Sequence, residues 1–203
     1  MRRVELNRER GRVPGGMILA MNHLGNVDPF VMSCLYHRQI HWLARIEFYR
    51  FQLFKWFLDS TGNIPINRTG VPIKAIRRAI AWLGQGSIVG IFPEGGVAVA
   101  KMSMLFGGPF KRGACTIALC SGAPIVPVVM VGTQMMNAVK PWLPFRRARL
   151  YVNYGEPIFP GKLDGRASHR RMRLELAEQL AAAYVKMFQE LEQAAPECRQ
   201  YMR

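Results

Sequence analysis

Long apolar runs are missing from this sequence of 203 residues. No stretch approaches the roughly 20 consecutive apolar residues that a membrane-spanning helix needs. The first 16 residues, MRRVELNRERGRVPGG, are polar at the point where a secretion signal carries an apolar segment after its charges. The sequence therefore predicts a chain that is soluble or lies on a membrane surface.

Acidic residues are scarce. The chain has 13 Asp and Glu against 28 Lys and Arg, which gives a net charge of +15 and a sequence pI near 10.4. Such a surface attracts polyanions, so nucleic acids, anionic lipid headgroups and phosphorylated substrates are all candidate partners. A solubility adaptation is the alternative. The sequence has no recognisable nucleic-acid-binding motif, so no specific nucleic-acid partner is expected.

Cysteine is also rare, and the sequence lacks the patterns of a cysteine metal site and of a serine nucleophile. The four cysteines, at positions 34, 115, 120 and 198, lack metal-site spacing, and we expect buried free thiols in a reducing compartment. No Gly-x-Ser-x-Gly elbow is present, so no serine nucleophile is predicted. Cys34 with His23 would be an alternative nucleophile–base pair, but Cys34 falls in an apolar helical segment and is expected in the core.

What remains is the composition of an ordinary globular domain. Half of the residues are hydrophobic and 20% are charged, and 203 residues suit a single domain that buries a core. Short apolar runs alternate with segments of helical character, which predicts an α/β sheet flanked by helices. Expected strands are 17–21, 40–44, 62–68, 87–92, 125–131 and 149–154, with Pro127 marking an edge or a bulge. Expected helices are 28–35, 47–58, 71–83, 110–119 and 167–195, and residues 1–16 form a basic lead-in.

The segment AMNHLGNVDPF, residues 20–30, places His23 five positions before Asp28. On one helix two such residues would lie about 140° apart and could not cooperate. In a turn after a strand, which the backbone freedom of Gly25 and Asn26 would permit, the carboxylate could accept from one imidazole nitrogen and leave the other as a base. Alternatively, Asp28 only caps a helix and His23 is an ordinary turn residue.

Three later segments carry further polar candidates. An arginine ends GNIPINR, a glutamate and two glycines follow a buried strand in FPEGG, and two cations lie at the start of a predicted helix in PFKRGA. Guanidinium groups and glycine-rich turns suit the binding of phosphate, yet each segment alone is also compatible with a surface charge or an ordinary turn. The candidates are Arg68, Glu94, Gly95, Gly96, Lys111 and Arg112.

The order of these motifs resembles the glycerolipid acyltransferases of the 1-acylglycerol-3-phosphate acyltransferase family. His-x-x-x-x-Asp is followed by Gly-x-x-x-x-x-Arg, Phe-Pro-Glu-Gly, Pro-Phe-Lys-x-Gly-Ala and IVPV, and the resemblance spans about residues 17–132. It implies a single domain, 1–203, with a mixed, mostly parallel sheet flanked by helices, of the glycerophosphate-acyltransferase type. It also implies transfer of a fatty acyl group from a coenzyme A or acyl carrier protein thioester to a glycerolipid hydroxyl, without a further cofactor or metal.

Carried over by position, the resemblance assigns catalytic roles to two residues. His23 would be the general base that takes the proton from the acceptor hydroxyl, and Asp28 would orient it. Arg68 matches the arginine that binds the acceptor phosphate. Glu94 and Gly95 match the first half of the family's Glu-Gly-Thr-Arg block.

That block is incomplete here, because Gly96 and Val97 stand in place of Thr and Arg. Loss of one bidentate arginine–phosphate contact would weaken recognition by about 1.5–3 kcal/mol. Either Lys101, Lys111 or Arg112 compensates, or the acceptor is not lysophosphatidic acid. The segment that follows is also a few residues longer than is usual in the family.

Residues 40–60, IHWLARIEFYRFQLFKWFLDS, mix aromatic side chains with Arg45, Arg50 and Lys55. Aromatic residues beside cations are typical of a membrane interface, although burial of this segment by the rest of the fold would explain it equally well. With the resemblance, the segment predicts a peripheral protein on the anionic, cytoplasmic face of a membrane.

The leading hypothesis is therefore a peripheral-membrane O-acyltransferase that uses acyl-CoA or acyl carrier protein and a lysophospholipid acceptor. Two alternatives remain. One is an acyl thioesterase, in which water replaces the lipid hydroxyl. The other is a non-catalytic basic module of the same fold that binds lipid or nucleic acid.

Overall fold

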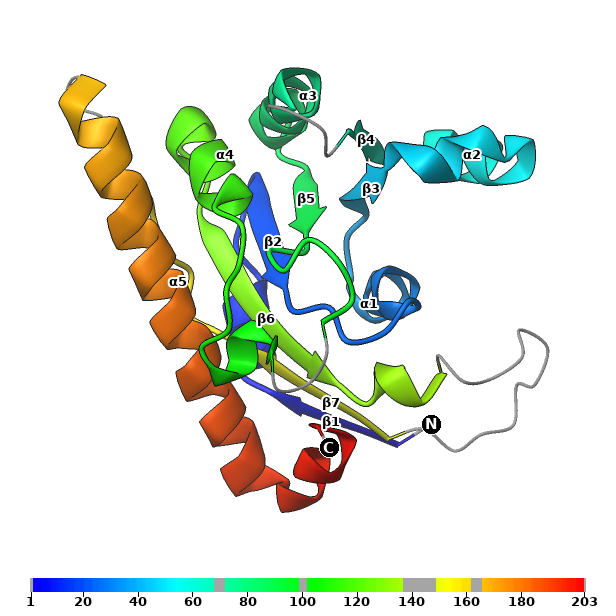
Figure 1. The fold of residues 1–203 in the computed structure, drawn as a ribbon, viewed down its shortest axis with the longest axis vertical. Coiled ribbons are helices and arrows are strands. Elements are labelled where there is room, and N and C mark those ends of the chain that lie inside the picture. Colours follow the sequence, from blue (N-terminus) through cyan, green and yellow to red (C-terminus); the bar gives the residue numbers. More distant parts are fainter. Residues whose placement is uncertain (1, 68–71, 99–101, 137–148, 162–165, 203) are drawn as a thin grey trace.

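A computed structural model describes residues 2–67, 72–98, 102–136, 149–161 and 166–202 (Figure 1). These residues form one seven-stranded sheet in the order β1-β7-β6-β2-β5-β3-β4. The strands are β1 Arg2–Leu6, β2 Met17–Met21, β3 Ile40–Arg45, β4 Ile64–Ile66, β5 Ile88–Ile91, β6 Ile125–Val131 and β7 Arg149–Tyr154. Neighbours pair in parallel except β6 and β7, which are antiparallel, so the expected mixed, mostly parallel sheet is confirmed.

Helices cover both faces of the sheet, which is why β2, β5 and β6 are apolar without interruption and buried throughout. Helices α3, α4 and α5 cover one face of the sheet and α1 covers the other (Figure 1). Side chains of the first three belong to one buried cluster, and Met32 of α1 belongs to the other. The helices are α1 Asp28–Leu35, α2 Gln52–Ser60, α3 Ile73–Gly84, α4 Gly113–Ser121 and α5 Arg166–Ala194. Short 3₁₀ helices are η1 Arg8–Gly11, η2 Ile46–Arg50, η4 Met104–Phe106, η5 Thr133–Met136 and η6 Pro196–Met202.

The long helix α5 follows the periodicity that the sequence predicts. Its apolar positions recur three or four residues apart and face the sheet, where Leu180, Tyr184 and Leu191 are fully buried. The hydroxyl of Tyr184 donates a 2.6 Å hydrogen bond to the carbonyl oxygen of Ala20 in β2. The helix is therefore joined to the strand that leads into the His23 turn.

The basic lead-in contains a strand that the sequence did not indicate. Residues Arg2–Leu6 pair in parallel with β7 and form one edge of the sheet. Their composition, RRVEL, has no apolar run, because an edge strand bonds on one side only and its side chains reach solvent. No strand was predicted within residues 1–16, so this one was missed.

Pro127 lies in the interior of the sheet, so the expectation of an edge is wrong. Its strand β6 is flanked by β7 and β2, and the alternative of a bulge describes the geometry better. Val128 pairs with Tyr154 and Ile125 pairs with Ile158. Residues 126 and 127 of β6 therefore lie opposite the three residues 155–157, which is the pattern of a bulge. Proline is tolerated there because the regular ladder is interrupted.

Only two of the four cysteines are buried. Burial raises the pKa of the thiols of Cys115 and Cys198 to about 11. Cys34 and Cys120 are exposed, so the expectation that they belong to the core is wrong. Cys34 follows the buried Met32 by two residues, which places it on roughly the opposite side of α1.

The segment expected to be one helix over 47–58 is divided into η2 and α2 at Phe51. Helix α2 packs against η2 and extends away from the sheet at the side of β3 and β4 (Figure 1). Its large apolar side chains are mostly exposed, which excludes the alternative of a buried helix. Among the described residues, no helix is long and apolar enough to cross a membrane.

Candidate functional site

The site lies at the carboxyl ends of two neighbouring parallel strands. Ala20 of β2 pairs with Ile91 of β5, and the chain leaves both strands at the same edge of the sheet. His23 follows β2 by two residues and Glu94 follows β5 by three. Loops that leave parallel strands at this edge commonly form ligand sites, and here they bring the sequence-predicted residues together.

His23 and Asp28 are in direct contact. Nδ1 of His23 lies 2.9 Å from Oδ2 of Asp28, and the same oxygen accepts 2.9 Å hydrogen bonds from the backbone N–H groups of Leu24 and Gly25. Asp28 is 1% exposed. Helix α1 begins at Asp28, with Val27 as the preceding cap residue and no side-chain cap bond. The carboxylate therefore turns back toward the histidine, and helix capping alone does not explain it.

Two neighbours hold this turn in place. Asn22 is fully buried, and its side-chain amide exchanges hydrogen bonds of 2.9 and 2.7 Å with the backbone of Met130 in β6. Gly25 does not have a positive φ, so the expected need for a special backbone conformation is wrong. A Cβ atom there would lie 2.9 Å from the carbonyl carbon of Thr133, so glycine is required for space.

The hydrogen bond to Asp28 sets the tautomer of His23. A carboxylate only accepts hydrogen bonds, so Nδ1 carries the proton and Nε2 keeps its lone pair. The imidazole ring also stacks on Phe92, with ring centroids 4.1 Å apart. Phe92 in turn stacks on Trp42 of β3. The sequence reasoning missed both aromatic residues, because no spacing rule connects them with His23.

Glu94 binds the protein rather than facing away from it. Its Oε2 accepts a 2.5 Å hydrogen bond from the backbone N–H of His23, and its Oε1 accepts from the hydroxyl of Ser103 (2.5 Å) and the N–H of Met104 (2.9 Å). The N–H of Ala98 donates to the carbonyl oxygen of His23 over 2.7 Å. Glu94 thus joins the histidine turn to the segment 102–108, and Ser103 is a site residue that the sequence reasoning missed.

The turn after Glu94 places a lysine at the site. Gly95 has φ +73°, and its N–H donates to the carbonyl oxygen of Phe92, so this amide is not turned toward a ligand as expected. A Cβ atom on Gly95 would lie 2.9 Å from Cε and 3.3 Å from Nζ of Lys111. The exposed Lys111 therefore extends across the turn. Gly96 is the next residue of this turn and is partly buried.

The other candidate cations are placed differently. Arg112 is exposed and is the residue directly before α4. Arg68 and Lys101 lie outside the described residues. Within the described part of the chain, no group of three or more His, Cys, Asp and Glu side chains could hold a metal ion.

Comparison with known proteins agrees with this geometry. The model of the family described as Acyltransferase matches residues 3–131, which include His23, Asp28 and Glu94. This chain belongs to the acyltransferase family.

Several relatives in the family carry the same name, 1-acyl-sn-glycerol-3-phosphate acyltransferase. The protein from Bacillus subtilis is 29% identical over 153 residues, which are 75% of this chain and 71% of that protein. The protein from Cocos nucifera is 32% identical over 146 residues, 70% of this chain and 45% of its own. A chloroplastic protein from Brassica napus, BAT2, is 27% identical, with 72% and 42% covered. The chain thus spans less than half the length of the two plant relatives.

A solved structure shows the same fold. The crystal structure of the 1-acyl-sn-glycerophosphate (LPA) acyltransferase PlsC from Thermotoga maritima superposes with a TM-score of 0.62, at 19% identity, over 89% of this chain and 71% of that one. The expected fold of the acyltransferase type is therefore confirmed.

Proposed function

We propose that this acyltransferase moves a fatty acyl group from an acyl-CoA or acyl carrier protein thioester to the hydroxyl of a lysophospholipid at a membrane surface. The observation that carries the proposal is the contact of His23 with the buried Asp28 at the edge of the sheet where Glu94 also lies. Relatives named for 1-acyl-sn-glycerol-3-phosphate support the choice of acceptor.

In the proposed reaction, Nε2 of His23 takes the proton of the acceptor hydroxyl while the oxygen attacks the thioester carbonyl carbon. The new ester bond forms, the carbon–sulfur bond breaks, and the thiolate leaves with the proton from the imidazolium. Asp28 keeps the imidazole in the reactive tautomer and stabilises its charged form between the two steps. This mechanism of direct attack needs no acyl-enzyme on Cys34.

A strongly basic stretch of the sequence supports an acceptor that carries phosphate. Between Asp59 and Glu156 the sequence has eleven Lys and Arg residues, and Glu94 is the only acidic residue. Its carboxylate already accepts hydrogen bonds from three protein donors. We propose that Lys111, which crosses the Gly95 turn, supplies the cation that Val97 removes from the family's block.

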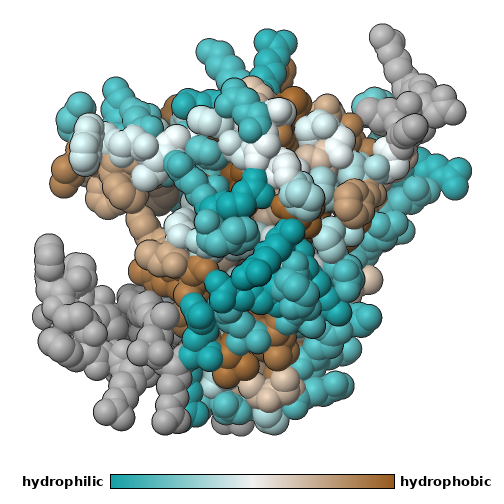
Figure 2. All heavy atoms as spheres, turned by 180° about the vertical axis from the view of Figure 1, so that it is seen from behind, coloured by the Kyte–Doolittle hydropathy of each residue, from teal (hydrophilic) through white to brown (hydrophobic). Residues whose placement is uncertain are grey.

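The surface of α2 supports contact with lipid. Phe51 directly before α2 is 68% exposed, and Leu53 and Trp56 on α2 are 76% and 68% exposed. The exposed cations nearby in the sequence are Lys55 on α2, Arg50 at the end of η2 and Arg45 at the end of β3. Figure 2, seen from behind, has hydrophobic side chains on the surface at its upper left, where α2 lies. A nine-residue amphipathic helix of this kind suits the interface of an anionic membrane, with aromatic rings in the lipid and cations at the headgroups.

This lipid-facing surface reaches the catalytic turn. The rings of Phe30 on α1 and Phe57 on α2 lie 5.9 Å apart, and Phe30 follows Asp28 by two residues. An acceptor held in the membrane by its acyl chain could therefore present its hydroxyl to His23 without leaving the lipid.

An acceptor panel tests the proposal. The purified protein receives palmitoyl-CoA or palmitoyl–acyl carrier protein together with lysophosphatidic acid, lysophosphatidylcholine, glycerol-3-phosphate or no acceptor, and release of free thiol is measured. We expect release that depends on a lysophospholipid and is largest with lysophosphatidic acid. Release without any acceptor would instead identify a thioesterase. No release with any acceptor, together with nucleic-acid binding that falls steeply with salt, would favour the non-catalytic module.

A further inference from the structure

We infer that Phe92, supported by Trp42, is a positioning residue that fixes the imidazole plane of His23. The inference rests on the proposed role of His23 as the base. Ring centroids of His23 and Phe92 are 4.1 Å apart with an interplanar angle of 23°, and those of Phe92 and Trp42 are 4.8 Å apart with an angle of 10°. The three rings form one continuous stack that ends at the reactive side chain.

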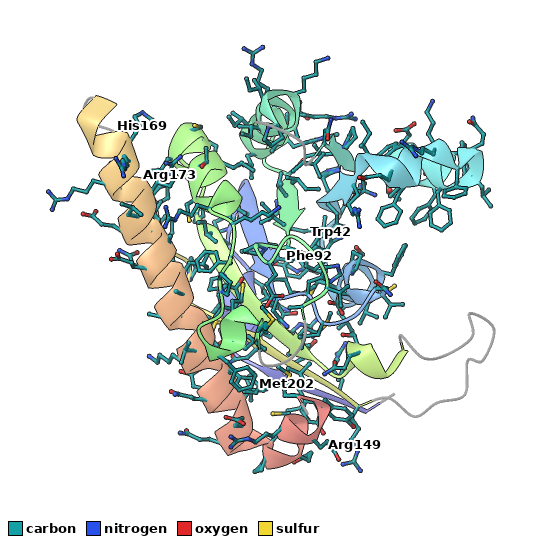
Figure 3. All side chains as sticks on the ribbon, viewed as in Figure 1. Trp42, Phe92, Arg149, His169, Arg173 and Met202 are labelled. Carbon is teal, nitrogen blue, oxygen red and sulfur yellow. The ribbon has the colours of Figure 1, made fainter. Side chains whose placement is uncertain are left out.

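The stack depends on a glycine in β5. Trp42 pairs with Gly90, and a Cβ atom at Gly90 would lie 2.6 Å from Cδ2 of the indole. The indole therefore lies flat across the backbone of β5. Residues 90 and 92 point to the same side of an extended chain, so the same indole also reaches the ring of Phe92. Figure 3 shows Trp42 and Phe92 beside one another near the end of β5.

A hydrogen bond fixes the rotation of the indole. Nε1 of Trp42 donates to the hydroxyl of Ser33 on α1 over 2.9 Å, and Trp42 is 5% exposed. The same helix begins with Asp28, which holds Nδ1 of His23. Helix α1 therefore determines two features of the imidazole, because Asp28 fixes one nitrogen and Trp42, through Phe92, supports one face.

A flat aromatic ring serves this purpose better than an aliphatic side chain. Parallel stacking resists rotation of the imidazole about its Cβ–Cγ bond, so Nε2 stays directed at the acceptor. The ring face also attracts the positive charge that the imidazole gains when it takes the proton. An aliphatic residue of similar size would fill the space and provide neither effect.

Two substitutions of Phe92 distinguish the effect of ring stacking on His23 from the effect of merely filling the space beside it. Phe92→Leu keeps an apolar side chain and removes the ring, whereas Phe92→Tyr keeps the ring. With a saturating thioester and lysophosphatidic acid, we expect Phe92→Leu to lower kcat at least tenfold with little change in either KM. Phe92→Tyr should retain kcat within about threefold.

A spectroscopic measurement tests the stack without any turnover. The ring current of Phe92 shifts the imidazole protons of His23 upfield, and the chain has only four histidines, so a His23→Gln variant assigns the signals in histidine-labelled protein. We expect these signals to move downfield in Phe92→Leu and to remain in place in Phe92→Tyr. Because this readout needs no substrate, it remains informative even if the proposed acyl transfer fails.

A second stack in the same chain provides the matched control. His41 and Trp82 have ring centroids 4.0 Å apart at an angle of 11°, away from the catalytic edge. Trp82→Leu should lower the melting temperature and leave kcat within about twofold. Unchanged kcat in Phe92→Leu would overturn the inference. An equal loss in Phe92→Tyr, or His23 signals that do not move in Phe92→Leu, would also overturn it.

Discussion

His23 lies at the carboxyl ends of the parallel strands and His41 lies near their amino ends, and the two imidazole rings have similar surroundings. Each imidazole stacks on one aromatic ring, and each uses Nδ1 for a hydrogen bond within the protein. The difference is the partner of Nδ1. His23 faces the carboxylate of Asp28, whereas His41 lies 3.1 Å from the neutral carbonyl oxygen of Gly62. A carboxylate stabilises a positive charge on the ring more strongly than a neutral carbonyl oxygen does, so similar packing supports different chemistry.

The two edges also differ in how their charged residues are used. At the amino-terminal edge, a cavity of about 600 Å³ lies beside His41 and includes Arg38 in its lining. The guanidinium of Arg38 donates to the carbonyl oxygens of Val13 (3.1 Å) and Gly15 (2.7 Å), so it stabilises the chain rather than offering a free cation. At the carboxyl edge Lys111 is exposed beside the Gly95 turn. The comparison predicts that substitutions affect turnover at one edge and stability at the other.

The largest effect on turnover is expected at His23, and the matched substitution at His41 is the control. His23→Ala removes the proposed base and should lower kcat/KM by about 10²–10⁴-fold, the usual contribution of general base catalysis. His41→Gln should leave kcat/KM within about threefold. Thiol release with lysophosphatidic acid measures both. Equal activity of His23→Ala and the unmodified protein would end the assignment of His23.

The next effect tests the partner of Nδ1. In Asp28→Asn the amide oxygen can take the place of Oδ2, which accepts from Nδ1 of His23 and from the N–H groups of Leu24 and Gly25, but the negative charge that stabilises the imidazolium is lost. We expect kcat to fall by about 100-fold, within the range for loss of a general base, with the KM for lysophospholipid nearly unchanged. Circular dichroism melting is the control for folding. A fully active Asp28→Asn would mean that the carboxylate serves the turn only.

Glu94→Gln should have a smaller effect. The amide of this variant has one acceptor oxygen in place of two. Its NH2 group therefore faces either the N–H of His23 or the donors of Ser103 and Met104, and the hydrogen bonds on that side are lost. We expect kcat to fall about tenfold, with the KM for the acceptor unchanged. Ser103→Ala, which removes one of the three donors, is the milder companion. A rise in the KM for lysophosphatidic acid alone would show that Glu94 binds substrate instead.

The sequence contained most of the information on the sheet, because parallel strands buried on both faces must be apolar throughout. It also contained His23 and Asp28, which are five residues apart and joined by one tight turn. The contact between Glu94 and His23 spans 71 positions, and no periodicity records such a pairing. The stack of Trp42 on Phe92 depends on strand order, which places β3 beside β5.

The edge strand β1 and the surface of α2 show two further limits of sequence reasoning. An edge strand with polar side chains has no distinctive pattern, so Arg2–Leu6 looked like a charged tail. For α2, the apolar composition was evident, but composition alone did not decide between burial and exposure. Only the position of the helix beyond β3 and β4 shows that the rest of the described chain leaves it uncovered.

The smallest effect on turnover is expected at α2. Here the two ends of the strands are compared by their binding to a membrane. Trp56 is 68% exposed on α2, and Phe159 is 66% exposed directly after Ile158, which bridges to the first residue of β6 at the amino-terminal edge. In co-sedimentation with vesicles that contain anionic phospholipid, Trp56→Ser should weaken binding about fivefold, because one large apolar side chain no longer enters the lipid. Phe159→Ser should bind as the unmodified protein does, and both variants should keep kcat with detergent-dispersed acceptor. Equal weakening by the two substitutions would mean that lipid contact does not distinguish the edges and that the net positive charge alone brings the protein to the membrane.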